Sequence, residues 1–73
     1  QTMRKEIGRH WGDETYPNRE AIIYFNVDEA YWEVEFWDKK QLIETRPMVT
    51  AGVAHSEQYA EDAAENWCLG YIP

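Results

Sequence analysis

The sequence predicts an α+β fold in which a three- to four-stranded antiparallel sheet, a meander, carries one C-terminal helix on one face. Two observations lead to this prediction. Residues 31–37 (YWEVEFW) alternate with a period of two, as a half-buried strand does, and extended patterns flank them. Residues 56–69 place small and aromatic residues at helical spacing behind a serine. At 73 residues, the chain makes a single small domain.

The first nineteen residues have the weakest pattern and are assigned as loop or strand. Residues 3–7 fit either a short strand or one helical turn. The turn-forming residues that follow favour a loop, and they are Gly8, Gly12, Pro17 and Asn18. We expect Trp11 and Tyr16 to anchor this loop on the core.

Residues 20–49 are predicted to form the meander. Alternate residues on both sides of the strand at 20–27 are apolar, which is typical of a central strand or of one covered on both faces. Asn26 and Asp28 then favour a short turn over residues 26–30, because their side chains can hydrogen-bond the local backbone. Residues 31–37 and 41–48 make the next hairpin, with Lys39 and Lys40 as its turn residues.

A two-residue turn at Lys39 and Lys40 fixes a register for this hairpin. It places Phe36 opposite Ile43, Val34 opposite Thr45, and Glu33 opposite Arg46. It also places Glu35 opposite Glu44, which is repulsive, so other loop lengths stay open. Pro47 cannot donate a backbone hydrogen bond, which predicts that this last strand lies at a sheet edge or ends at Pro47.

Residues 50–54 are small and predict a flexible connector before a helix over residues 55–69. Ser56 is a suitable N-cap, and Gly70 is a suitable stop. The predicted buried stripe of this helix consists of Tyr59, Ala60, Ala63, Ala64 and Trp67. We expect this stripe to pack against one face of the strand at 31–37, which carries Trp32, Val34 and Phe36.

The charge balance restricts the classes of partner. With 14 acidic and 7 basic residues, the net charge of −7 excludes the basic footprint that nucleic-acid binding requires. Such acidity fits solubility, a basic protein partner, or imitation of DNA charge toward a DNA-binding protein. The last alternative requires one continuous surface that holds seven acids: Glu33, Glu35, Glu44, Glu57, Glu61, Asp62 and Glu65.

Enzymatic chemistry has little support in the sequence. His10 and His55 lack a second ligand at metal-binding spacing, and Ser56 lacks a nucleophile motif. Cys68 is a single cysteine near a helix end, so we expect neither a disulfide nor a zinc site. No catalytic residue, metal or cofactor is predicted, and no apolar run is long enough to span a membrane. We expect a cytoplasmic protein.

Aromatic residues beside carboxylates make the best candidate site. Tyr31, Glu33, Glu35 and Trp37 share one face of their strand, and Glu44 is expected to join them across the hairpin. This group predicts a surface that binds a basic protein partner, or a second copy of the chain. The prediction holds only if the N-terminal segment does not fold over that face through Trp11 or Tyr16.

Three segments resemble a group of known sequences: YWEVEFW at 31–37, LIET at 42–45, and HSEQYAEDAAENW at 55–67. Over roughly residues 31–69 the chain is similar to small uncharacterised phage proteins, notably from viruses of marine bacteria. The resemblance implies an intracellular accessory protein of a phage that binds and redirects a host protein, and it assigns no functional residue.

Overall fold

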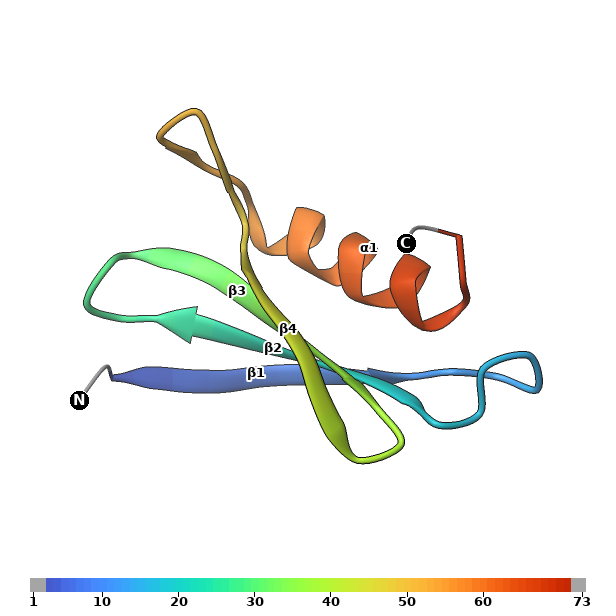
Figure 1. Cartoon of the computed structure of the whole chain (residues 1–73). Helices are drawn as coiled ribbons and strands as arrows, with labels where there is room; N and C mark the ends of the chain where they lie inside the picture. Colours follow the sequence, from blue (N-terminus) through green and yellow to red (C-terminus); the bar gives the residue numbers. More distant parts are fainter. Residues whose placement is uncertain (1–2, 72–73) are drawn as a thin grey trace.

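The computed structural model describes residues 3–71 of the chain. Its elements are β1 (Arg4–Trp11), β2 (Arg19–Asn26), β3 (Tyr31–Asp38), β4 (Gln41–Pro47), β5 (Val49–Thr50), β6 (Val53–Ala54) and α1 (Glu57–Cys68). The first four strands form one antiparallel sheet in the order β1-β2-β3-β4, and α1 lies across one face of it (Figure 1). The predicted meander with a C-terminal helix is confirmed.

The N-terminal segment contributes an edge strand. Of the two interpretations of residues 3–7, the strand is correct, and the loop predicted at Gly8 is wrong. After a bulge between Glu6 and Gly8, β1 continues past Gly8 to Trp11, paired with β2 throughout. Glycine is a weak strand former, but Gly8 stays in the strand because the bulge before it lets the hydrogen bonding with β2 resume. Trp11 does not anchor the core, since 65% of it is exposed.

The loop between β1 and β2 is tied to the far end of the chain by Arg19. Its guanidinium lies between two rings, 4.0 Å from the centre of Tyr16 and 4.5 Å from that of Trp67. It also donates a hydrogen bond of 2.7 Å to the carbonyl oxygen of Trp67. The last turn of α1 has no basic residue. Arg19 therefore supplies the positive charge that favours the carbonyl end of the helix.

The turn between β3 and β4 confirms Lys39 and Lys40 as its two central residues, with φ angles of 52° and 65°. The predicted register holds next to the turn, where Trp37 pairs with Leu42, and fails one residue later. A bulge between Phe36 and Trp37 shifts the pairing, so that Phe36 faces Glu44 and Glu35 faces Thr45. The shift removes the Glu35–Glu44 repulsion that the unbulged register would contain.

Residues 49–54 form a second small hairpin, where the sequence predicted a flexible connector over residues 50–54. Val49 pairs with Ala54 and Thr50 with Val53, around a turn of Ala51 and Gly52. Both turn residues have positive φ, 53° and 80°, which suits a two-residue hairpin loop. The hairpin extends from the end of β4 on the helix side of the sheet (Figure 1).

Helix α1 begins and ends as predicted. The Ser56 hydroxyl accepts a hydrogen bond of 3.3 Å from the backbone N–H of Tyr59, which caps the first turn. Gly70 has a φ of 84°, and the N–H of Tyr71 donates to the carbonyl of Asn66 at 2.8 Å. This is a Schellman end, in which glycine takes the left-handed position.

The buried stripe of α1 is rotated from the predicted one and consists of Ala60, Ala64, Trp67 and Cys68. Tyr59 was wrongly assigned to it, because 47% of this residue is exposed and its ring stacks on His55 at 3.8 Å. Alanine on the inner side lets the helix approach the sheet closely, and Trp67 packs on Phe36 with ring centres 4.8 Å apart. The core between the layers consists of these residues with Ala21, Ile23, Val34, Phe36 and Met48.

Strand β4 lies outside the area that α1 covers. The helix packs on β2, β3 and β1. In β4, only Arg46 is even half-buried, and its guanidinium lies 5.1 Å from the ring centre of Phe36. Arg46 therefore shields the β4 side of the core in place of the helix. No helix in residues 3–71 is long and apolar enough to cross a membrane.

Candidate functional site

The sheet face opposite α1 is the candidate site, and we call it the open face. No helix or further strand of residues 3–71 lies over it (Figure 1). The strand registers place these residues on it: Arg4, Glu6, Arg9 and Trp11 of β1; Glu20, Ile22, Tyr24 and Asn26 of β2; Tyr31, Glu33, Glu35 and Trp37 of β3; Leu42, Thr45 and Pro47 of β4.

The structure brings together four of the five predicted site residues. Tyr31, Glu33, Glu35 and Trp37 alternate along β3 and all belong to the open face. Glu44 does not join them, because the bulge in the β3–β4 ladder places it opposite Phe36, on the helix side. There its carboxylate accepts two hydrogen bonds of 3.0 Å from Arg46. These bonds lower the pKa of Glu44 below its usual value.

Glu33 and Glu35 are buried, although no backbone layer covers them. Glu33 is 8% exposed and Glu35 is 6% exposed, so these two acids of the predicted binding surface are largely shielded from solvent. Long side chains around them exclude the water. Arg4 reaches across from β1, lies 4.0 Å over the ring of Tyr24, and pairs with both carboxylates. The N-terminal segment thus shields the face with one side chain and adds no covering layer.

The two carboxylates are not equally satisfied. Glu35 accepts a hydrogen bond of 2.5 Å from Arg4 and another of 3.1 Å from the indole Nε1 of Trp37. Glu33 is 3.7 Å from the nearest nitrogen of Arg4, and the Nδ2 of Asn26 is 3.5 Å away. Charge-assisted hydrogen bonds are typically about 2.7–2.9 Å long. Glu33 therefore has only long contacts in a buried position.

Perturbed ionisation accompanies this cluster. Burial alone would lower the pKa of Arg4, but the hydrogen bond and negative charge of Glu35 outweigh it, so this pKa is raised. Burial, followed by the charge of Glu35, raises the pKa of Tyr24. Arg4 therefore stays charged and Tyr24 stays neutral near pH 7. The cluster then holds one cation against two carboxylates.

The surrounding part of the open face is exposed and already paired in charge. Arg9 donates to Glu6 at 2.8 Å and to Glu20 at 2.7 Å, with all three side chains partly in solvent. The same end of the face carries the exposed apolar side chains of Trp11 and Leu42. Aromatic side chains such as that of Trp11 are enriched at protein interfaces.

The surface required for imitation of DNA charge is not present. Glu33 and Glu35 lie buried on the open face, whereas the acids of α1 lie on the opposite side of the sheet. Glu44 lies on the helix side, and its carboxylate is paired with Arg46. The seven acids therefore do not form one continuous surface, which weighs against that alternative.

The remaining candidate groups have local structural partners. His10 lies 3.6 Å from Glu61, which links β1 to α1, and His55 hydrogen-bonds Thr50 at 2.8 Å. Cys68 is fully buried, and burial raises the pKa of its thiol to about 11. Within residues 3–71, no group of three His, Cys, Asp or Glu side chains has the geometry to hold a metal ion.

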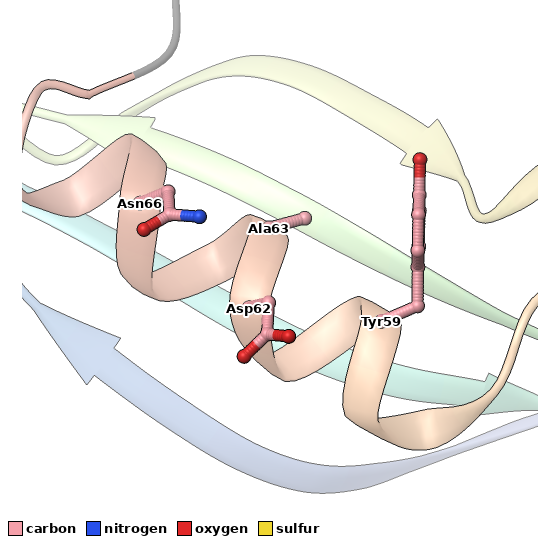
Figure 2. Close-up of a pocket in the computed structure, with 4 residues that line it drawn as sticks. All are labelled: Tyr59, Asp62, Ala63 and Asn66. Atoms are coloured by element: carbon pink, nitrogen blue, oxygen red, sulfur yellow. The ribbon is translucent and has the colours of Figure 1, made fainter.

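A shallow hollow of about 290 Å³ lies along α1 (Figure 2). It is lined by Tyr59, Asp62, Ala63 and Asn66, all from the helix itself.

Comparison with family models, with curated proteins and with solved structures finds no match. The resemblance to phage proteins therefore stays a prediction.

Proposed function

We propose that the protein is a non-enzymatic interaction module that binds a basic protein partner through its open face. The observation that carries the proposal is an uncovered sheet face whose centre holds two buried carboxylates against one guanidinium. Half-buried Tyr31 lies at one end of that centre, and half-buried Trp37 lies at the other end with exposed Trp11 and Leu42. A partner with apolar and cationic groups would complement both parts.

The alternative of self-assembly has less support. A second copy would bring an equally acidic face against the first, because the open face holds four glutamates and two arginines. The sheet edges are also poor templates for pairing. Strand β1 is bulged near Ile7, and β4 is bulged near Ile43 and carries Pro47. Bulges and edge prolines are devices that prevent strand addition.

From the phage resemblance, we propose further that the partner is a host protein in the host cytoplasm. An accessory protein that acts by docking needs a face of this kind and no catalytic group. This part of the proposal rests on the quoted sequence segments alone.

The experiment compares Trp11→Ala with Tyr71→Ala. Both aromatics are exposed, but only Trp11 belongs to the open face. We expect a partner captured from lysate at low salt to bind Trp11→Ala about 30-fold more weakly, since a tryptophan hot spot contributes about 2 kcal/mol. Tyr71→Ala should bind like the parent protein. Equal binding by both variants, or no capture at low salt, would contradict the proposal.

Self-association is tested separately by sedimentation at micromolar concentration. We expect a monomer, because like-charged faces repel and both edge strands are interrupted. A dimer that dissociates in Trp11→Ala would favour the alternative instead.

A further inference from the structure

We propose that Glu33 receives an arginine side chain of the partner, and that the open face selects arginine over lysine. This inference rests on the proposed function and adds the chemistry of the group recognised. It starts from the unequal pairing of the two buried carboxylates, and then considers which cation the neighbouring side chains suit.

The charge count at the centre of the open face leaves room for one more cation. Glu33 and Glu35 are both more than nine-tenths buried, and Arg4 is the cation that pairs with them. Its short hydrogen bond goes to Glu35, while Glu33 keeps contacts of 3.5 and 3.7 Å. Both contacts are long, so a guanidinium placed at Glu33 would give this carboxylate the short charge-assisted hydrogen bonds that its present partners do not make.

The face already shows how it holds a guanidinium. Arg4 stacks over the ring of Tyr24 at 4.0 Å while its nitrogens reach the carboxylates. A planar, weakly hydrated guanidinium can stack and hydrogen-bond at the same time, whereas an ammonium is a strongly hydrated point charge. Tyr31 precedes Glu33 by two residues on the same face and offers a second ring. These surroundings favour arginine.

The approach to Glu33 lies on the β4 side. Arg4 comes from β1 and covers Tyr24, so the β1 side is occupied. Across β4, the residue paired with Glu33 is Pro47, and Thr45 pairs with Glu35. Both are exposed and short, so a long side chain can pass over them. A second copy is a poor donor, because Arg4 and Arg9, the arginines of its own open face, are paired already.

The test uses two synthetic peptides of equal length and charge, one alternating glycine with arginine and the other glycine with lysine. Binding is followed at low salt by NMR of the tryptophan indole N–H groups. Trp37 is the reporter, because its Nε1 donates to Glu35, and Trp67 in the core is the control. We expect the arginine peptide to bind at least tenfold more tightly and to shift Trp37 but not Trp67.

Two matched variants locate the preference. Glu33→Gln keeps the shape and removes the charge, and we expect it to lose the arginine preference while its unfolding temperature stays equal or rises. Glu44→Gln removes an equal charge on the helix side of the sheet and should leave the preference unchanged. If Glu33→Gln fails to fold, Glu33→Asp retains the charge on a shorter side chain and should bind the arginine peptide more weakly than the parent.

The outcomes separate the two proposals. Equal affinity for both peptides, with a shift at Trp37, overturns the selection of arginine and leaves the proposed function standing. Binding of neither peptide overturns the arginine site, while the capture experiment with Trp11→Ala still decides the proposed function. An arginine preference that survives in Glu33→Gln places the site elsewhere and contradicts this inference.

Discussion

The two faces of the sheet exclude water in opposite ways. On the helix side, small and aromatic residues of α1 pack on Ile23, Val34 and Phe36, and the interior is apolar. On the open face, the side chains of Arg4, Tyr24 and Trp37 cover two carboxylates without any backbone above them. A residue therefore becomes buried without a second layer when long neighbours reach over it. Burial of this kind can be reopened by moving side chains alone.

The difference also separates stability from recognition. Apolar burial behind α1 contributes directly to folding. A buried ion pair contributes little net stability, because desolvation of the charges offsets their attraction. The charged cluster of the open face thus adds little to the stability of the fold, but it can distinguish between the chemical groups of a partner. Substitutions that affect one face at a time test this division.

The largest difference is expected between two adjacent isoleucines of β2. Ile23 is fully buried under the helix and Ile22 is 6% exposed on the open face. We expect Ile23→Ala to lower the free energy of unfolding by about 4 kcal/mol and Ile22→Ala by about 2 kcal/mol. The loss at Ile22 is smaller because flexible charged side chains beside it can move into the space that the isoleucine leaves. Urea denaturation measures both. Equal losses would show that the open face is packed as rigidly as the core.

A smaller effect is expected for the two arginines of β1. Arg4→Met leaves Glu33 and Glu35 buried without a cation and should cost about 2 kcal/mol, a value reduced because the Arg4 side chain is 32% exposed. Arg9→Met, whose partners Glu6 and Glu20 are in solvent, should cost less than about 1 kcal/mol. Thermal unfolding at neutral pH compares them. An Arg4→Met variant as stable as Arg9→Met would contradict the buried charge cluster.

The smallest effect on stability is expected for two exposed ion pairs, Glu6 with Arg9 on the open face and Glu44 with Arg46 on the helix side. Hydrogen bonds from Arg9 lower the pKa of Glu6, and those from Arg46 lower the pKa of Glu44. A lowered folded-state pKa contributes stability above the unfolded value, near 4.5, and this stability is lost as the pH falls through the folded value. We expect a double variant, Glu6→Gln with Glu44→Gln, to lose less stability on acidification.

Unfolding temperatures measured from pH 6 down to pH 3 would show this as a shallower decline than in the parent protein. The double variant should match the parent closely at low pH, where the parent carboxylates are also protonated. A decline of unchanged steepness would assign the acid sensitivity to other carboxylates.

The fold was largely predictable because its signals are local. A run that is apolar on both sides located β2, period-two alternation located β3, paired lysines located a turn, and Ser56 located the start of α1. The errors occur where tertiary contacts decide. Gly8 is read as a loop residue from its own preference, yet pairing with Ile23 holds it in a strand. Tyr59 fits the helical stripe by angle, but closer approach through Ala60 and Ala64 turns it outward.

The candidate site was predictable only along a single strand. Strand parity suffices to group Tyr31, Glu33, Glu35 and Trp37. A bulge moves the residues beyond it to the other face of the strand, so Glu44 was grouped with them wrongly. The repulsion between Glu35 and Glu44 in the unbulged register was the sign in the sequence that this register was wrong. Arg4 was missed because it lies 31 positions from Glu35 in the chain and reaches it through the sheet.

The hairpin tips have a practical consequence for studying this protein. Ala30, Lys39, Lys40 and Ala51 all adopt positive φ angles, between 52° and 65°, which side chains disfavour by roughly 1 kcal/mol each. These turns lie outside the cluster around Glu33, so glycine or asparagine there would provide a reserve of stability without altering the recognition chemistry. A variant stabilised by such turn substitutions would remain folded even when destabilising replacements of Arg4, Glu33 and Glu35 are added.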